Sequence, residues 1–258
     1  MIRFSIITCT YQAEKVLQRT LDSTLCQTYP AVEHIIIDGA SEDGTWGIIE
    51  DYEQENASEG SLHEVHVICE PDKGLYDAMN KGIARATGDY LCFLNAGDVF
   101  PSSLTLEKIA AGMAEGEQLP GVLYGDTDVV DDAGHFLRHR RLTPPEHLSW
   151  RSFKQGMLVC HQAFYARVDL AKQTLYDLSY VYSADVDWCI RIMKAAEEAN
   201  LPLRNVHQVV VNYLAGGMSI KNHRASLQER FRTMHRHYGL LTTLVMHVWF
   251  VVRAFLRR

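Results

Sequence analysis

The chain contains 258 residues, 47% of them apolar, and carries a formal net charge of −7 with a pI near 5.9. This apolar content is enough for the core of one large α/β domain or two small ones. The acidic balance argues against a general nucleic-acid-binding protein, because phosphate binding needs a basic face. The six cysteines form no Cys-x-x-Cys pair and the twelve histidines no His-Glu-x-x-His motif. We therefore expect free thiols of a reducing compartment and no structural zinc site.

Four apolar, β-branched segments in the first hundred residues each run into polar or acidic residues. The segments are 4–8, 32–37, 65–68 and 90–94, followed by Thr10 and Tyr11, Asp38, Glu70 to Asp72, and Asn95 to Asp98. Helical spacing between them predicts helices over roughly 13–27, 44–55 and 75–87. Such alternation is typical of a parallel sheet, in which ligands bind outside the carboxyl ends of the strands. We therefore expect the four polar strand ends to converge on one crevice.

The second half of the chain is read from weaker patterns. It predicts a short helix from 102 to 112, a strand over 122–126, a hairpin over 129–136, a helix over 187–200, a strand over 206–213 and a helix over 224–237. No Ser/Pro-rich linker divides the chain. The sequence thus predicts one domain over 1–239, with a nucleotide-binding half over 1–98 and a second half over 99–239 on the same sheet.

The tail, 240–258, has a composition of its own. Residues 240–252 are nearly all apolar and are followed by Arg253, Arg257 and Arg258. About 13 residues are too few for a bilayer that needs roughly 20. On a helix, Thr242, Thr243, His247 and the arginines share one arc and apolar residues fill the other, with Met246 and Phe250 on the polar side. A basic amphipathic helix of this kind fits a membrane interface. The alternative is a terminal helix packed on the domain or on a second subunit. The start of the chain carries no pattern of a secretory signal.

Several residues at the predicted strand ends suit a nucleotide ligand. The turn after the first strand lacks the G-x-G-x-x-G of a dinucleotide-binding oxidoreductase. Tyr11 suits stacking on a base and Asp38 suits accepting a ring N–H, although half-buried packing would explain Tyr11 equally well. A carboxylate at Asp98 suits a divalent ion that bridges diphosphate oxygens, although Asn95 to Asp98 also reads as a simple turn.

Asp185 and Asp187 open a predicted helix. An aspartate at a helix N-terminus often only caps the helix or interacts with its dipole. One of the two carboxylates can cap while the other points into the crevice. Their spacing does not decide which.

An ordered series of motifs resembles family 2 glycosyltransferases of the GT-A fold, most of all the bacterial colanic-acid, exopolysaccharide and O-antigen enzymes. The matching segments are Ser5 to Tyr11, Ser23 to Pro30, Glu33 to Thr45, Glu70 to Gly82, Ala86 to Tyr90, Leu94 to Asp98, Ala184 to Arg191 and Gly216 to Ser219. The resemblance covers roughly residues 3–225. It implies an α/β fold with a mostly parallel central sheet flanked by helices, a Rossmann-like nucleotide half, an acceptor half and the C-terminal amphipathic helix.

The resemblance also implies residue roles. Thr10, Tyr11 and Asp38 would hold the base, Asp72, Lys73 and Asn80 would lie near the nucleotide, Asn95 would face ribose or phosphate, Asp98 would ligate Mg²⁺ or Mn²⁺, and Asp185 would be the catalytic base. The chain departs from the family at two positions. The usual D-x-D motif keeps only its last carboxylate, and the acid that usually precedes the base is Ala184.

We therefore expect an inverting hexosyl- or N-acetylhexosaminyl-transferase that uses a nucleotide-sugar donor. Its acceptor would be a saccharide, in particular a lipid-linked oligosaccharide of bacterial surface polysaccharide synthesis, met at the inner face of the cell membrane by a peripheral cytoplasmic enzyme. The basic run 135–141 suits an acceptor pyrophosphate, or else forms a solvated hairpin strand. Two other functions stay open. A nucleotidyltransferase should show a glycine-rich loop that 9–15 lacks, and the altered D-x-D motif suits a non-catalytic nucleotide-sugar-binding subunit.

Overall fold

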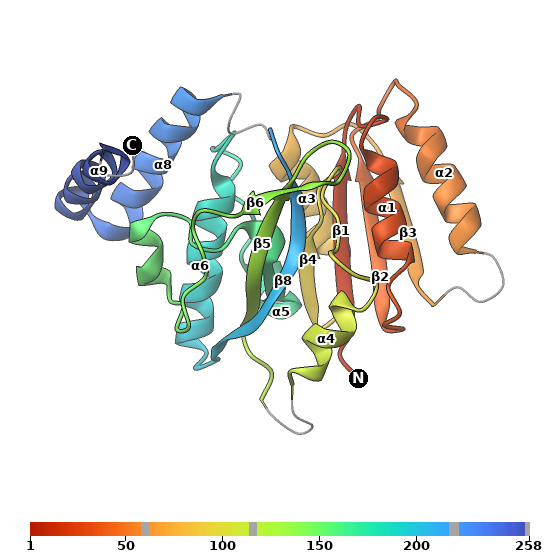
Figure 1. Ribbon diagram of the computed structural model, residues 1–258, viewed down its shortest axis with the longest axis horizontal. Helices are drawn as coiled ribbons and strands as arrows, with labels where there is room; N and C mark the ends of the chain where they lie inside the picture. Colours follow the sequence, from red (N-terminus) through yellow and green to blue (C-terminus); the bar gives the residue numbers. More distant parts are fainter. Residues whose placement is uncertain (58–61, 114–117, 217–221, 256–258) are drawn as a thin grey trace.

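The computed structural model describes residues 1–57, 62–113, 118–216 and 222–255. An eight-stranded mixed sheet runs through the centre in the order β3-β2-β1-β4-β7-β5-β6, and β8 pairs with β5 (Figure 1). Its strands are β1 (Phe4–Thr10), β2 (Val32–Asp38), β3 (Glu64–Cys69), β4 (Tyr90–Phe93), β5 (Val122–Val130), β6 (Phe136–His139), β7 (Phe164–Arg167) and β8 (Leu203–Leu214). The helices are α1 (Leu17–Leu25), α2 (Thr45–Asn56), α3 (Leu75–Arg85), α4 (Thr105–Ala111), α5 (Val168–Gln173), α6 (Ala184–Glu198), α8 (His223–Tyr238) and α9 (Leu240–Phe255), with short 3₁₀ segments η1 (Trp150–Gln155) and η2 (His161–Ala163).

The first four strands form the parallel half that the sequence predicts. Every residue of β1, β2 and β4 is buried, because helices cover both faces of these strands, and this explains their nearly continuous apolar sequences. The register aligns Thr10 with Asp38 and Asp38 with Cys69. The carboxyl ends of β1, β2 and β3 therefore lie in one row.

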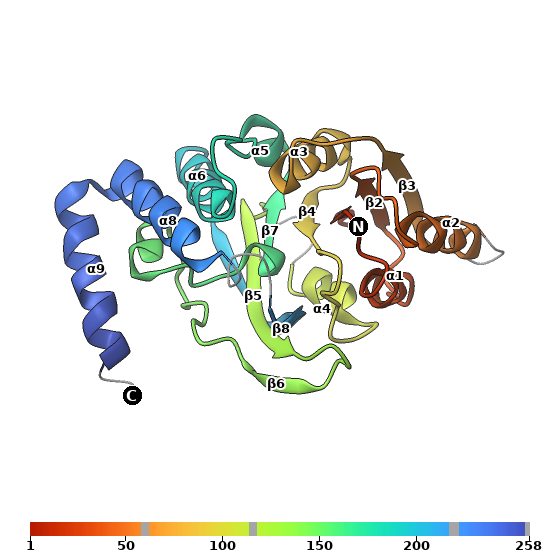
Figure 2. The ribbon, with the colours of Figure 1, turned by 90° about the horizontal axis from the view of Figure 1, so that it is seen from above.

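Helices α1 and α2 lie on one face of the sheet, and α3, α5 and α6 lie on the other (Figure 2). Leu17 and Leu21 of α1 pack with Ile36 of β2 and with Ile49 and Tyr52 of α2. A larger cluster on the other side continues into the second half of the molecule through β4, β7 and α6. One continuous sheet thus connects the two halves.

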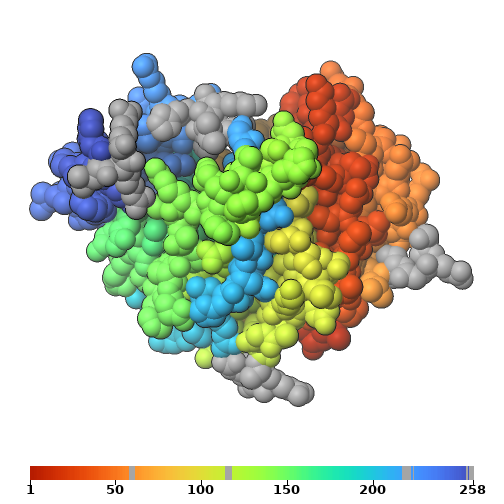
Figure 3. Space-filling model, in the orientation of Figure 1, coloured from red at the N-terminus to blue at the C-terminus, as the bar shows by residue number. Residues whose placement is uncertain are grey.

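The second half departs from the predicted elements. Neither β7 nor α5 is expected from the sequence, yet β7 pairs antiparallel with both β4 and β5 and so joins the halves. The hairpin is confirmed as β5 and β6, and α6 begins at Ala184 rather than Asp187. In Figure 3 the N-terminal half, in red and orange, and helices α8 and α9, in blue, occupy opposite sides of the molecule.

Helix α9 packs against α8 and η1 with the face that carries its polar residues. Thr243 is fully buried, and the ring of His247 meets Phe231 of α8 edge to face at 5.0 Å. The apolar residues point outward instead: Leu241, Val245, Val248 and Phe255 are 79%, 59%, 65% and 69% exposed. Among the described residues, no helix has both the length and the hydropathy to cross a bilayer.

Glu33 of β2 is a fully buried carboxylate at the amino end of the sheet. It accepts hydrogen bonds from the Ser5 hydroxyl at 2.5 Å, from the amide and hydroxyl of Thr87 at 2.5 and 2.8 Å, and from the Gly88 amide at 2.9 Å. Burial by itself raises the pKa of Glu33, but these donors more than offset it and hold the pKa below its ordinary value. One side chain thus ties β1, β2 and the turn into β4.

We predict that Glu33→Gln lowers the free energy of unfolding by about 1–3 kcal/mol, because an amide N–H₂ would face N–H and O–H donors. A lowered folded-state pKa stabilises the protein above the unfolded pKa and is lost as pH falls through the folded value. The difference in free energy of unfolding between wild type and variant, measured by urea unfolding, should therefore become smaller as the pH is lowered. Glu64→Gln is the control, since Glu64 lies beside Glu33 in the neighbouring strand β3 and pairs with Arg3, but its side chain is 62% exposed. An equal loss in both variants would contradict the role of Glu33.

Candidate active site

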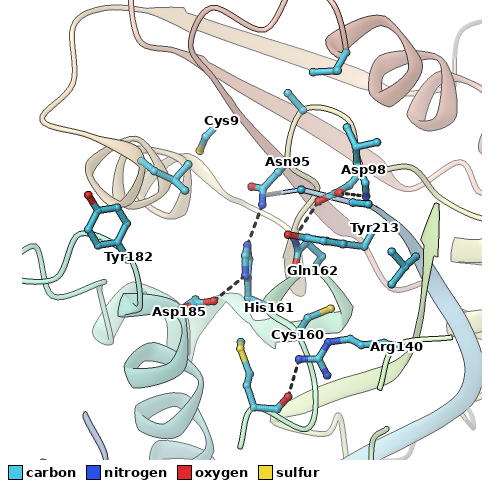
Figure 4. A pocket seen from close by; sticks show the side chains of 18 of the residues that line it. Cys9, Asn95, Asp98, Arg140, Cys160, His161, Gln162, Tyr182, Asp185 and Tyr213 are labelled. Carbon is cyan, nitrogen blue, oxygen red and sulfur yellow. Dashed lines mark hydrogen bonds and ion pairs between the residues drawn. The ribbon is translucent and has the colours of Figure 1, made fainter. Parts of the chain in front are cut away.

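A cavity of about 720 Å³ lies beyond the carboxyl ends of β1 and β4. Cys9 of β1 lines it together with Asn95 and Asp98, which follow β4, and η2, the start of α6 and the end of β8 complete its wall (Figure 4). The convergence expected for the β1 and β4 ends is therefore present. The ends of β2 and β3 lie beside this cavity rather than on its wall.

Asp185, in the first turn of α6, presents its carboxylate to the cavity. Its side chain is 18% exposed, Oδ1 accepts the Val186 N–H at 2.9 Å, and Oδ2 lies 3.4 Å from Nδ1 of His161. Burial by itself raises the pKa of Asp185, but the bond and the charge of His161, together with Arg230, offset burial and lower the pKa below its usual value. Asp185 is therefore a carboxylate near neutral pH, in the protonation state that a general base needs.

Asp187 faces away from the cavity. It is fully buried and pairs with Arg191 at 2.6 Å and with His237 of α8 at 2.8 Å. Another carboxylate, that of Glu229 on α8, accepts three successive backbone N–H groups, from residues 181, 182 and 183. The structure thus answers the question that the spacing leaves open. Asp187 joins α6 to α8, and Asp185 faces the cavity.

Asn95 lines the cavity directly after β4. Its Nδ2 lies 3.1 Å from Nε2 of His161, and its Oδ1 is buried without a partner among the described residues. Asn95, His161 and Asp185 therefore form a continuous row of polar contacts across the cavity wall (Figure 4). The unpartnered oxygen leaves Asn95 with an acceptor to offer a hydroxyl of the ligand.

Asp98 has a different position from the one expected of a metal ligand. Its carboxylate is 3% exposed, Oδ1 accepts the Leu214 N–H at 2.9 Å, and Oδ2 accepts Nε2–H of Gln162 at 2.9 Å. Burial raises its pKa to about 6 in spite of these bonds. No group of three His, Cys, Asp or Glu residues able to hold a metal occurs in the described ranges. These residues do not fit a divalent ion held by the protein, because the carboxylate expected to bind it already joins two chain segments.

The residues expected at the base lie at the carboxyl ends of β1 and β2. Tyr11 is 62% exposed, whereas Thr10 and Asp38 are buried. Asp38 accepts both the amide N–H and the hydroxyl of Ser41, at 2.8 and 2.6 Å. A Cβ at Gly39 would come within 2.6 Å of Oδ2 of Asp72 and 3.3 Å of the Tyr11 ring. Tyr11 and Asp72 therefore pack closely on either side of the space beside Gly39, and Tyr11 remains largely exposed.

Two predicted site residues have other partners. The side-chain amide of Asn80 bonds the backbone of Tyr176 in both directions, at 3.0 and 2.8 Å, and so joins α3 to the segment before α6. Lys73 is exposed, and its backbone N–H bonds Asp77. Neither side chain lines the cavity. Most of the Gly216 to Ser219 motif lies outside the described residues.

Sequence reasoning missed His161 and Gln162, and it named Arg140 only as part of the basic run 135–141. His161 and Gln162 form a polar pair inside an otherwise apolar stretch, 157–166, which is the signal that was available. Arg140, from the basic run after β6, turns inward and donates to the carbonyls of residues 142, 157 and 158 at 2.7–3.1 Å. Its guanidinium group lines the cavity, so part of the run expected to meet pyrophosphate does face the site.

Comparisons with known proteins agree with this fold. Residues 5–174 match the model of Glycosyl transferase family 2. The PGL/p-HBAD biosynthesis glycosyltransferase of Mycobacterium bovis (strain BCG / Pasteur 1173P2) is 34% identical over 218 residues, which are 84% of this chain and 78% of that protein. The amylovoran biosynthesis glycosyltransferase AmsB of Erwinia amylovora is 29% identical over 220 residues, 81% of this chain and 70% of AmsB.

Solved structures share the architecture at low sequence identity. S. aureus TarS 1-349 in complex with UDP-GlcNAc has a TM-score of 0.70 at 18% identity, over 91% of this chain and 65% of that one. The mannosyltransferase PcManGT from Pyrobaculum calidifontis, in complex with GDP-Man and Mn²⁺, has a TM-score of 0.62 at 16% identity, over 91% and 64%. The chain thus spans just under two thirds of these solved chains.

The sequence match and the fold agree, and the chain belongs to glycosyl transferase family 2. The GT-A type α/β fold expected from the sequence is confirmed.

We predict that Asp98→Ala destabilises the protein by about 1–3 kcal/mol, because it leaves buried N–H groups of Leu214 and Gln162 unpaired. Asp98→Asn should be far milder, since its Oδ1 can still accept the Leu214 N–H and a rotated Gln162 amide can accept from its Nδ2–H. Because Asp98 does not fit a metal ion, titration calorimetry of the wild-type protein should give, for UDP and for GDP separately, the same affinity in EDTA as in Mn²⁺. Asp132→Ala, on an exposed cavity-lining residue, is the control. Metal-dependent nucleotide binding that Asp98→Asn abolishes would restore the metal role.

Proposed function

We propose that this chain transfers a sugar from a nucleotide-sugar donor to a saccharide acceptor, with inversion at the anomeric carbon. The observation that carries the proposal is the position of Asp185, a lowered-pKa carboxylate on the cavity wall opposite the strand ends. Family membership and the nucleotide complexes of TarS and PcManGT support the donor class. The transferred group would be a hexosyl or N-acetylhexosaminyl residue.

The proposed mechanism assigns a role to each side of the cavity. The surface bordered by Tyr11 and Asp72 would take the nucleotide base, with Thr10 and Asp38 supporting it from below and Lys73 at its rim. Asn95 would face the ribose or the diphosphate with its unpartnered oxygen or its amide. Asp185 would remove the proton from the acceptor hydroxyl as that oxygen attacks the anomeric carbon from the side opposite the leaving diphosphate. One base and one displacement invert the configuration.

The charge of the leaving diphosphate needs a cation. Asp98 does not fit a protein-held Mg²⁺ or Mn²⁺ ion, because both of its oxygens already accept N–H groups. Four arginines line the cavity: Arg138, Arg140, Arg141 and Arg230. None of them pairs with a carboxylate within the described ranges. Their positive charge suits a diphosphate of the donor or of a lipid-linked acceptor.

We also propose that α9 attaches the enzyme peripherally to the cytoplasmic face of the membrane, where a lipid-linked acceptor of surface polysaccharide synthesis would be met. Support comes from the outward apolar face of α9, since a helix packed only for stability would bury that face. Sixteen residues of helix span about 24 Å, short of a hydrocarbon core of about 30 Å. An in-plane position therefore suits α9 better than a spanning one.

Asp185→Asn should lower kcat by about 10²-fold or more with nearly unchanged donor affinity, because general-base catalysis contributes about 10²–10⁴-fold. The assay is mass spectrometry of products from a panel of UDP-, GDP- and dTDP-sugars with a membrane extract. Asp187→Asn is the matched variant. It should lower the melting temperature through its lost ion pairs and keep kcat within a few fold. Turnover of Asp185→Asn near the wild-type level would reject Asp185 as the base.

Mass spectrometry also separates the other functions, when a sugar phosphate and a nucleoside triphosphate are included among the substrates. A non-catalytic subunit would bind nucleotide-sugar without acceptor-dependent turnover. A nucleotidyltransferase would form nucleotide-sugar from a sugar phosphate and a nucleoside triphosphate and release pyrophosphate. Either result would replace the proposal.

A double variant tests the membrane role of α9. Val245→Glu with Val248→Glu places two charges on the outward apolar face and should abolish co-sedimentation with phosphatidylglycerol-containing liposomes. Leu62→Glu, at a 54% exposed apolar residue far from α9 in sequence, should leave co-sedimentation intact. If the double variant still sediments and instead dissociates a dimer in light scattering, the face is a subunit interface.

A further inference from the structure

His161 lies between the two sides of the site. It opens η2, is 9% exposed and contacts Asn95 through Nε2 at 3.1 Å and Asp185 through Nδ1 at 3.4 Å. Its ring rests against Phe93 of β4 at a centroid distance of 6.2 Å and an interplanar angle of 62°. Figure 4 shows the imidazole between the two polar side chains. The ring therefore has a fixed plane and a partner at each nitrogen.

These partners determine the position of the proton on the ring. When the Asn95 amide donates, Nε2 must accept, and the single proton of a neutral imidazole stays on Nδ1. If the amide is turned so that Oδ1 faces Nε2, both nitrogens must carry protons, because a bare Nδ1 would face the carboxylate of Asp185. Either arrangement directs Nδ1–H toward Oδ2 of Asp185. The geometry thus makes His161 a donor to the candidate base.

This donor controls the direction of the carboxylate. Oδ1 of Asp185 is bonded to the Val186 N–H, and Oδ2 meets His161. These two contacts restrain rotation of the carboxylate, and each oxygen keeps a lone pair for an acceptor hydroxyl. The charged groups around the pair are Asp98, behind Gln162, and Arg230 of α8, which also lines the cavity. A separation of 3.4 Å is long for a hydrogen bond, and such contacts often shorten when substrate binds.

We propose that His161 is a positioning residue that orients Asp185 through Nδ1–H and connects this orientation to Asn95 on the donor side. The proposal rests on the proposed function, since it takes Asp185 as the base. Loss of the Nδ1–H donor frees the carboxylate to turn, and a misplacement of about 1 Å can cost about 10²-fold in rate. The loss of rate should appear in kcat and not in donor KM, because His161 acts on the base and not on the nucleotide surface around Tyr11.

Two substitutions separate the two nitrogens of His161. The side-chain N–H₂ of asparagine can take the place of Nδ1, and that of glutamine can take the place of Nε2. His161→Asn should keep kcat within a few fold of wild type, whereas His161→Gln should lower kcat by about 10–100-fold with an unchanged donor KM. Equal kcat in the two variants, or a loss confined to donor KM, would overturn the proposal. Thermal unfolding of both variants checks that each is folded at the assay temperature.

Asp185→Asn provides the reference for the kinetic test. In that background His161→Gln should add no further loss, since the residues act as one unit. If Asp185→Asn alone is active, the proposed function fails in its choice of base. If Asp185→Asn is inactive and His161→Gln is fully active, only the role of His161 fails.

A ligand-free measurement tests the same geometry without any donor or acceptor. Long-range ¹H–¹⁵N spectra of protein labelled at histidine should show a proton on Nδ1 of His161, assigned by its loss in His161→Asn. A ring protonated on Nε2 alone would overturn the proposal. Asp185→Asn should shift the Nδ1 signal of His161, and an unchanged signal would also count against it.

Discussion

The carboxylate of Asp98 is the interaction on which the shape of the cavity depends. Burying an ionised carboxylate is costly unless its oxygens are hydrogen-bonded, and here each oxygen has one N–H donor. The two donors come from η2 and from the end of β8. The backbone carbonyl of Asp98 also accepts the Thr20 hydroxyl of α1 at 2.8 Å. One residue thus holds four separate segments in a single arrangement.

The position of the candidate catalytic residues follows from this arrangement. The loop of Asn95 and Asp98 and the segment of His161 and Gln162 are joined twice, by Asp98 to Gln162 and by Asn95 to His161. Once the first contact is made, the second falls within reach. Segment 181–183, held by Glu229 of α8, then brings Asp185 to the free side of His161. The polar row across the cavity therefore depends on a buried contact behind it.

The parallel half was predictable because its signals are local. Each strand there contains apolar, β-branched residues in a short stretch, and helices with clear spacing lie between them. β7 is four residues long and pairs with strands distant in sequence, and η2 is a single turn, so neither leaves a periodic pattern. Residue types alone also could not decide the role of Asp98, because an aspartate at a strand end suits a metal ion and a buried hydrogen-bonded contact equally well. Amphipathicity correctly predicted two faces for α9 but not which of them the protein would cover.

Because one partner of Asp98 lies far along the sequence, the cavity can form only late in synthesis of the chain. Leu214, which donates to this carboxylate, lies 116 residues beyond it. At ribosomal speeds of about 5–20 residues per second, the partner is synthesised about 6–23 s after Asp98. Strands β1 to β4 and their helices need nothing beyond residue 93 to make their own contacts with one another. A ribosome that stalls between these two points holds a chain in which strands β1 to β4 are complete and the cavity has not yet formed.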